Sequence, residues 1–112
     1  MHELGLMDRL LADALATGAA SIRKLRVRIG ALSGVEPDAL RFAFAALSPG
    51  TPAEGAALEI DPAPVRMACD RCGASYEASP ARYVCPSCGS ATGDIVGGTE
   101  VELLSIEVPG HV

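Results

Sequence analysis

The chain has 112 residues, a net charge of −5 and a sequence pI of about 4.9. This acidic balance argues against a sequence-independent grip on nucleic acid or on an anionic membrane surface. No window offers about 20 continuous apolar residues, and no basic segment precedes an apolar stretch at the N-terminus. We therefore expect a cytoplasmic protein, in a compartment that keeps thiols reduced.

The N-terminal region has the apolar spacing of an amphipathic helix. Leu4, Met7, Leu11 and Ala14 fall on one helical face, which predicts a helix from residue 4 to about residue 17. Gly18 follows and is a suitable stop signal.

A strand is predicted over residues 25–29, where apolar residues alternate with Arg26 and Arg28. Together with Arg23 and Lys24, these arginines form the basic cluster of the sequence. The alternation favours a solvated strand face. Docking onto an acidic partner surface is the second interpretation.

Pro37 suits the first turn of a second helix, with Leu40, Phe44 and Leu47 on one face and an end before Ser48. A short strand is predicted next, at residues 58–60. The prolines at positions 62 and 64 are expected to mark a boundary.

The β-branched run at residues 101–108 predicts a closing strand. Burial on both of its faces is our explanation for the adjacent Leu103 and Leu104. The predicted fold is α+β, with two helices packed on a small mixed three-stranded sheet. We expect residues 1–63 plus 97–112 to form one discontinuous α+β domain, into which a cysteine-rich module at residues 64–96 is inserted.

The cysteines form two C-x2-C pairs separated by twelve residues. They are Cys69, Cys72, Cys85 and Cys88. A two-residue gap lets a tight turn direct both sulfurs at one ion, and the glycine after each pair permits positive φ. Four thiolates enclose a tetrahedral ion and leave no open position, which predicts structural Zn(II).

Energetics agree with this interpretation, because the bulky apolar residues between Met67 and Ile95 are Tyr76, Tyr83 and Val84 alone. So few side chains do not offset the ordering entropy of the segment, whereas structural zinc contributes about 10–16 kcal/mol apparent in small zinc peptides.

Two other kinds of cysteine site were weighed. A rubredoxin-like iron site has similar knuckles, but its gap is longer and its aromatic core is missing here. A nucleic-acid-binding zinc ribbon has a basic surface, whereas residues 64–112 carry three arginines and six carboxylates.

The N-terminus offers a second set of metal donors. The α-amine of Met1, the amide nitrogen of His2 and the His2 imidazole can close adjacent chelate rings on one ion. The Glu3 amide or a carboxylate can add a further ligand. Deprotonated amides in planar geometry favour Ni(II) or Cu(II).

The sequence resembles the HypA family of hydrogenase and urease nickel-incorporation proteins over essentially its whole length. The matching segments are the opening MHELGL (1–6), residues 29–44 around LSGVEPDALRF, residues 55–60, the two cysteine pairs and residues 104–108. They occur in the order and spacing of the family. Gly5 is a departure, since serine is frequent there, but it removes no proposed ligand.

The resemblance implies a nickel metallochaperone for [NiFe]-hydrogenase, with urease as a second recipient. It assigns nickel to His2, with main-chain help from Met1 and Glu3, and it offers Asp38 as a tentative carboxylate. The implied cofactors are Ni(II) as transient cargo and structural Zn(II). The implied partners are a HypB-type GTPase, the hydrogenase large subunit and urease accessory proteins.

An enzymatic role is not expected. The chain has no G-x4-G-K-[ST] phosphate loop, so any GTP hydrolysis belongs to a partner. Its two histidines lie at the chain ends and every cysteine is assigned to zinc, and His111 is interpreted as a solvated tail residue. The alternative function is a non-catalytic zinc-ribbon adaptor without a nickel role.

Overall fold

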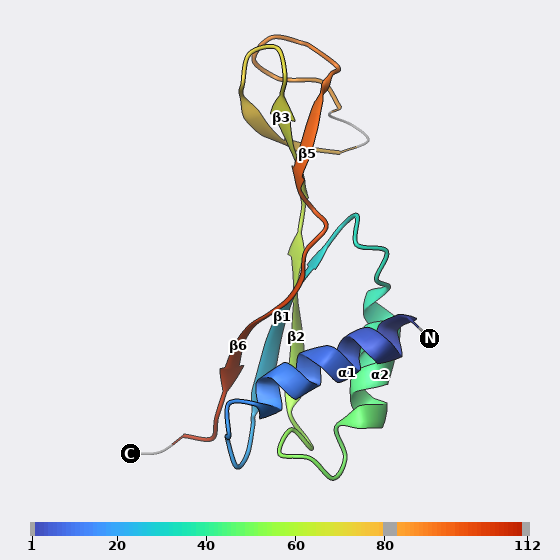
Figure 1. Ribbon diagram of the computed structural model, residues 1–112, viewed down its shortest axis with the longest axis vertical. Helices are drawn as coiled ribbons and strands as arrows, with labels where there is room; N and C mark the ends of the chain where they lie inside the picture. Colours follow the sequence, from blue (N-terminus) through green and yellow to red (C-terminus); the bar gives the residue numbers. More distant parts are fainter. Residues whose placement is uncertain (1, 80–82, 111–112) are drawn as a thin grey trace.

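The computed structural model describes residues 2–79 and 83–110. Within these residues the chain forms two helices and six strands in two sheets, and it extends 53 × 36 × 20 Å (Figure 1). The elements are α1 (His2–Leu15), β1 (Lys24–Gly30), α2 (Pro37–Leu47), β2 (Ala57–Ala63), β3 (Val65–Cys69), β4 (Ser75–Ala78), β5 (Gly93–Gly97) and β6 (Val101–Glu107). Figure 1 shows both helices beside the β2-β1-β6 sheet, while the cysteine-rich loops lie at the opposite end of the molecule.

The first sheet has the order β2-β1-β6, with β1 parallel to β2 and antiparallel to β6. It is the mixed three-stranded sheet that the sequence predicted. The two helices and one face of β1 bury the main core. Its members from these elements are Met7, Leu10, Leu11, Ala14, Leu25, Val27, Ile29, Leu40, Ala43 and Phe44.

Helix α1 begins at His2, two residues before the predicted start, and ends at Leu15. The apolar spacing could not mark this start, because His2 is exposed and does not contribute to the core. Gly18 has a φ of +80° and its N–H donates to the Leu15 carbonyl at 3.1 Å, so it is the stop that the sequence predicted.

The boundary predicted at Pro62 is wrong, because β2 continues through Pro62 to Ala63. Pro62 pairs with Ile29 of β1 in the parallel register. Strand β2 lies at the edge of the sheet, and an edge strand tolerates a residue that has no N–H to donate. Pro64 does separate β2 from β3.

The explanation offered for Leu103 and Leu104 is also wrong. Arg26 pairs with Ser105, but the next residue of β1, Val27, pairs with Leu103. Leu104 is therefore the extra residue of a β-bulge, and Leu103 packs on the core while Leu104 is not among the core residues. A bulge places two adjacent leucines in one strand without requiring burial on both faces.

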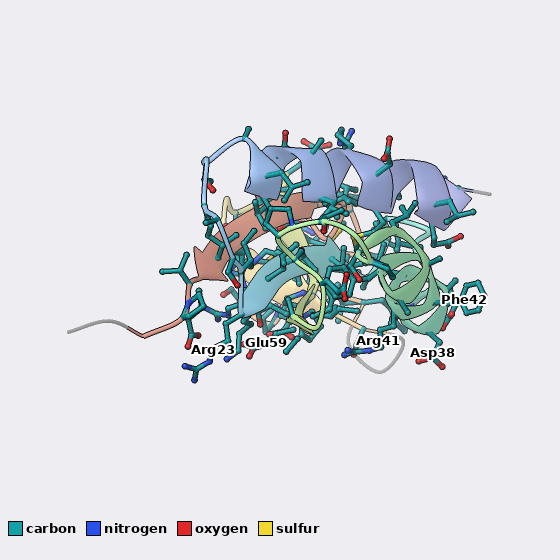
Figure 2. All side chains as sticks on the ribbon, turned by 90° about the horizontal axis from the view of Figure 1, so that it is seen from below. Arg23, Asp38, Arg41, Phe42 and Glu59 are labelled. Atoms are coloured by element: carbon teal, nitrogen blue, oxygen red, sulfur yellow. The ribbon has the colours of Figure 1, made fainter. Side chains whose placement is uncertain are left out.

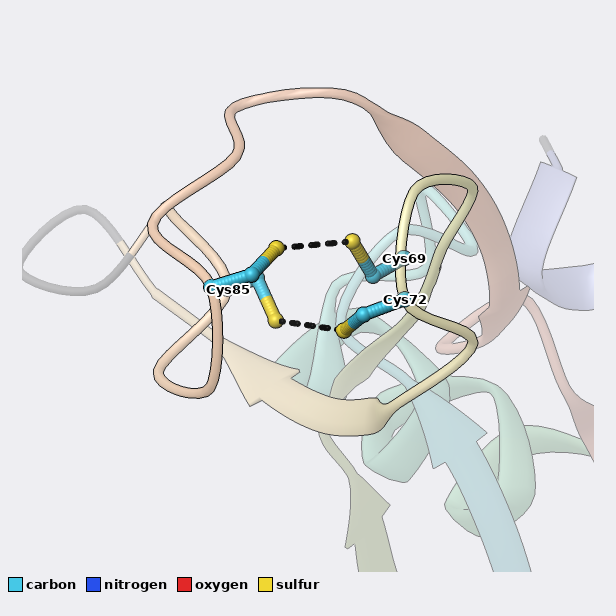
Figure 3. A group of neighbouring side chains, drawn as sticks. Cys69, Cys72 and Cys85 are labelled. Atoms are coloured by element: carbon cyan, nitrogen blue, oxygen red, sulfur yellow. Dashed lines mark hydrogen bonds between the residues drawn. The ribbon is translucent and has the colours of Figure 1, made fainter.

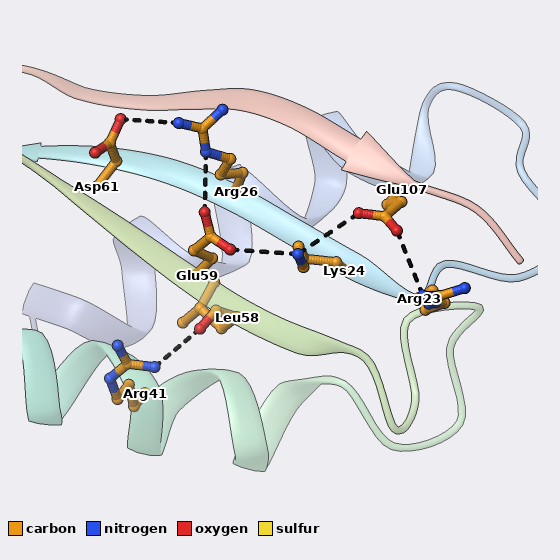
Figure 4. A network of polar contacts seen from close by, with 8 residues as sticks. All are labelled: Arg23, Lys24, Arg26, Arg41, Leu58, Glu59, Asp61 and Glu107. Carbon is orange, nitrogen blue, oxygen red and sulfur yellow. Dashed lines mark hydrogen bonds and ion pairs between the residues drawn. The ribbon is translucent and has the colours of Figure 1, made fainter.

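The face of the first sheet opposite the helices carries a row of ion pairs (Figure 4). Arg26 binds Glu59 at 3.1 Å and Asp61 at 3.4 Å, and Lys24 binds Glu59 at 3.3 Å. Glu107 of β6 binds Lys24 and Arg23. The basic cluster is thus a solvated strand face whose charges are balanced by neighbouring strands, as the favoured interpretation had it.

The second sheet has the order β4-β3-β5 and is antiparallel throughout. The chain enters it through Pro64 and leaves it through Gly98. Gly98 has a φ of +109°, its carbonyl accepts the Leu32 N–H at 2.6 Å, and it lies so close to Gly30 that a Cβ on Gly30 would overlap it. Neither of the two described helices has the length and apolar character to cross a membrane.

Candidate metal centres

The four cysteine sulfurs converge from two loops of the second sheet (Figure 3). All four lie within 4.8 Å of one another. The Sγ atoms of Cys69 and Cys88 are 3.6 Å apart, as are those of Cys72 and Cys85. These separations are far longer than the disulfide bond of about 2.05 Å, so the cysteines are free thiols.

This arrangement fits a zinc ion. Zn–S bonds of about 2.3 Å in tetrahedral geometry place sulfurs about 3.8 Å apart, close to the separations found here. Two of the four residues, Cys69 and Cys85, are buried and the other two are exposed. The site holds four soft ligands and leaves no position for a substrate, which suits a structural ion.

The two cysteine pairs lie in two separate backbone turns of the same type. The N–H of Gly73 donates to the Cys69 carbonyl at 2.9 Å, and the N–H of Gly89 donates to the Cys85 carbonyl at 2.8 Å. Both glycines have positive φ, 79° and 77°. The glycine that follows each pair therefore provides the left-handed residue that the sequence predicted.

Backbone donors in these turns favour thiolates. The amide N–H of Cys72, followed by that of Arg71, lowers the pKa of Cys69 to about 6. The pKa of Cys85 is lowered as well: burial opposes ionisation, but the amides of Cys88 and Ser87 outweigh it. Thiolates are the form that binds metal, so the fold prepares Cys69 and Cys85 for an ion. Cys72 differs: the Ala74 amide lowers its pKa, but the neighbouring Cys85 thiol and burial outweigh that effect and raise the pKa of Cys72 to about 12.

Polar side chains also join the two cysteine loops, through hydrogen bonds that do not involve the sulfur atoms. The hydroxyl of Thr92 donates to Asp70 at 2.5 Å and lies 2.8 Å from the hydroxyl of Ser90. The carbonyl of Ser90 in turn accepts the N–H of Cys85 at 2.8 Å. Sequence reasoning missed this link, because residues 70 and 92 are far apart along the chain and Thr92 lies outside both cysteine pairs.

The predicted nickel ligands lie at the start of α1. His2 is exposed at the first position of the helix, and Met1 lies outside the described residues. The carboxylate of Glu3 accepts the N–H of Glu36 at 3.1 Å, and this hydrogen bond is the main reason that the pKa of Glu3 is lowered. The start of α1 is therefore attached to the start of α2.

Glu36 is the N-cap of α2, and its carboxylate accepts the N–H of Ala39 at 2.7 Å. Sequence reasoning missed this role, since serine, threonine, aspartate and asparagine are the usual caps. Asp38 is exposed in the first turn of α2, and Figure 2 shows it projecting outward near Phe42. The contacts of the described residues join Glu3 to Glu36, but none of them joins Asp38 to His2.

Known proteins match this chain over nearly all of its length. The profile of the HypA family, described as hydrogenase/urease nickel incorporation metallochaperone, matches residues 1–108. A hydrogenase maturation factor HypA from Nitrosospira multiformis is 37% identical, with 96% of this chain and 97% of that protein covered. The protein of that name from Chloroflexus aurantiacus is 42% identical, with 97% and 100% covered.

Solved structures share the fold. The solution structure of the nickel metallochaperone HypA from Helicobacter pylori superposes with a TM-score of 0.66 at 24% identity, over 97% of this chain and 98% of that one. A second HypA solution structure gives 0.64 at 26% identity, over 94% and 90%. A zinc-ribbon adaptor without a nickel role is not favoured by these findings. The chain belongs to the HypA family of hydrogenase and urease nickel-incorporation metallochaperones.

Proposed function

We propose that this protein takes up Ni(II) at its N-terminus and passes it on during maturation of [NiFe]-hydrogenase, with urease as a second recipient. Nickel is the cargo and zinc is the resident ion. The single observation that carries the assignment of the nickel ligands is that α1 begins at His2, which is exposed and lies next to the attached Glu3.

A helix that begins at His2 suits an amine–amide–imidazole chelate. The first N–H groups of any α-helix have no acceptor within the helix, so the amides of His2 and Glu3 are free to lose their protons to a metal. Together with the Met1 amine and the His2 imidazole, these nitrogens provide a planar donor set, which Ni(II) accepts readily.

Nearby acids support a cation at this position. The start of a helix has partial positive charge, which disfavours a metal ion. Glu3 and Glu36 lie at the starts of α1 and α2, where they oppose that charge. We assign Asp38 as a further ligand, because it is exposed in the first turn of the helix to which Glu3 is attached.

We assign a different metal to each end of the molecule. We propose that Cys69, Cys72, Cys85 and Cys88 hold zinc in a module of residues 64–96, and that residues 1–63 plus 97–112 form the nickel-binding domain. A HypB-type GTPase, the hydrogenase large subunit and urease accessory proteins are the proposed partners, in the cytoplasm. The protein carries metal and does not catalyse a reaction.

The experiment compares the native N-terminus with an N-terminus extended by Gly-Ser. The extension moves the free amine away from His2 and breaks the chelate, while it leaves every side chain in place. Equilibrium dialysis against NiSO4 should show strong loss of nickel uptake with unchanged zinc. The same Gly-Ser added after Val112 is the matched control and should bind nickel normally. Equal uptake by the two extended proteins would rule out the chelate.

A further inference from the structure

A cavity of about 520 Å³ opens between the start of α2, the ends of β1 and β2, and β4 of the second sheet. It lies on the side of the first sheet that carries the core, beyond the point where α2 covers that side. Its side-chain lining includes Ile29, Val35, Pro37, Ile60 and Pro62. A cavity of this size and apolarity is suited to an apolar group from another molecule.

One charged residue lines this cavity among the described residues, namely Glu77 of β4. Its cross-strand neighbour, Arg66, lines an adjoining hollow that shares residues 62–64 with the cavity and that also contains Arg28 and Asp61. A group that enters the cavity therefore meets apolar walls and a single carboxylate. The net charge of −5 for the whole chain favours a basic partner as well.

The neighbouring edge of β2 suits an extended peptide. Ala57 donates to the Arg23 carbonyl and the Ala63 carbonyl accepts from Ala31, so residues 57 and 63 direct their backbone groups toward β1. Strand alternation then directs the N–H and carbonyl of Ile60 toward the outer edge. Arg41 already binds the outward carbonyl of Leu58 at 2.9 Å (Figure 4), which leaves Ile60 as the edge residue beside the cavity.

The cavity is also close to the nickel-binding end. Val35 and Pro37 line it, and the residue between them is Glu36, whose N–H is bound by the Glu3 carboxylate. A protein held in the cavity is therefore held beside the start of α1. Because nickel transfer requires the acceptor to lie beside His2, we take the occupant of the cavity to be the protein that receives the nickel.

We propose that this cavity docks an extended segment of the nickel recipient, in which an aliphatic or aromatic side chain is followed by a lysine or arginine. The apolar side chain fills the cavity, the backbone pairs with Ile60, and the basic side chain lies against Glu77. This inference rests on the proposed function, because the occupant is the acceptor of the nickel.

Two tryptophan variants of the zinc-loaded full chain test the apolar contact. Ala31 lines the cavity, whereas its neighbour Leu32 is 48% exposed and does not line it. Calorimetry with purified hydrogenase large-subunit precursor should show that Ala31→Trp raises the Kd by about tenfold or more, since the anchor loses its pocket. Leu32→Trp is the matched control and should leave the Kd unchanged.

Two charge reversals test the ionic contact independently of any misfolding of the tryptophan variant. Glu77→Lys should weaken precursor binding and reduce its salt dependence, because a like charge then faces the basic side chain. Asp94→Lys makes the same charge change at an exposed site on β5, and should have a smaller effect.

Normal precursor binding by both Ala31→Trp and Glu77→Lys would overturn the proposal. Sedimentation of the same proteins covers the alternative occupant: a wild-type dimer that Ala31→Trp converts to monomer, with precursor binding unchanged, would assign the cavity to a second copy instead. Nickel uptake separates this inference from the proposed function. Ala31→Trp should retain nickel, whereas a wild-type protein that takes up no nickel would remove the proposed function and leave the docking result standing.

Discussion

The carboxylate of Glu3 accepts a hydrogen bond from the backbone N–H of Glu36 at 3.1 Å, and so joins the first turn of α1 to the residue that caps α2. The bond fixes Glu3, the neighbour of His2, against the start of the second helix, which carries two acids, Glu36 and Asp38.

The Glu3–Glu36 bond predicts a pH-dependent contribution to stability. The pKa of Glu3 is lowered in the folded protein from an ordinary value of 4.5, chiefly by the Glu36 N–H. A lowered folded-state pKa means that the contribution is fully present at pH values well above the unfolded-state pKa of 4.5, and is lost as the pH falls through the folded-state pKa.

Nickel-free Glu3→Gln should therefore be less stable than the wild type at pH 7 in urea titrations, and the difference should shrink below pH 4.5, where Glu3 of the wild type becomes protonated. Asp8→Asn is a suitable control, because Asp8 is exposed on the same helix. A difference in stability that stays constant with pH would show that Glu3 acts through something other than its charge.

A second prediction concerns the close approach of Gly30 and Gly98. A methyl group on Gly30 would overlap the Gly98 backbone, so Gly30→Ala should destabilise the protein by about 1–3 kcal/mol, the usual cost of forcing atoms into a packed site. Gly5→Ala is the matched change, since nothing lies within 4 Å of that position and it is inside α1. It should stabilise the protein by about 0.5–1 kcal/mol.

Thermal unfolding of the two alanine variants measures these effects together. Equal midpoints for Gly30→Ala and the wild type would mean that β1 and the Gly98 segment separate easily, contrary to the contact described here.

The Asp70–Thr92 hydrogen bond is expected to slow the release of zinc from the wild-type protein. Thr92→Val keeps the shape of the side chain but removes the donor, so the knuckles lose a link outside the sulfurs. We expect zinc transfer to a colorimetric chelator to become about threefold to tenfold faster, as the loss of one hydrogen bond implies. Thr92→Ser, which restores the hydroxyl, should release zinc at nearly the wild-type rate. Identical rates for the valine and serine variants would exclude this role.

Removal of zinc should affect one end of the molecule. Within the described residues the buried cluster of the second sheet consists of Cys69, Tyr76 and Cys85, and two of these three are proposed zinc ligands. The first sheet and its helices have a separate, larger core. After chelation, amide NMR signals of residues 64–96 should collapse toward random-coil positions while those of α1, β1 and α2 stay dispersed. Loss of dispersion throughout the chain would contradict this.

The convergence of the four cysteines was predictable, because their spacing and the glycines that permit positive φ are both local features. The second helix was also predictable, since Pro37 and its apolar face mark it clearly. Predictions from the local sequence were wrong at two positions where the pairing of neighbouring strands determines the structure. Pro62 remains in a strand because that strand lies at a sheet edge, and Leu104 is accommodated by a bulge set by pairing with β1.

The contacts that organise the start of α1, where nickel is proposed to bind, could not be predicted from the local sequence. Glu3 and Glu36 are separated by 33 positions, and glutamate is an uncommon cap. The link between Asp70 and Thr92 likewise depends on how the two knuckles face each other. Donor types can be recognised from composition and spacing, but the hydrogen bonds that orient them require the tertiary structure.

The most direct test of the account is the nickel-to-zinc ratio of tag-free protein beside His2→Ala, after saturation with both metals and gel filtration. His2 is exposed, so the variant should fold normally and keep its full zinc content. The account predicts that His2→Ala loses nickel while zinc is unchanged. Equal nickel in the two proteins would contradict the assignment of His2, and parallel loss of both metals would contradict two separate sites.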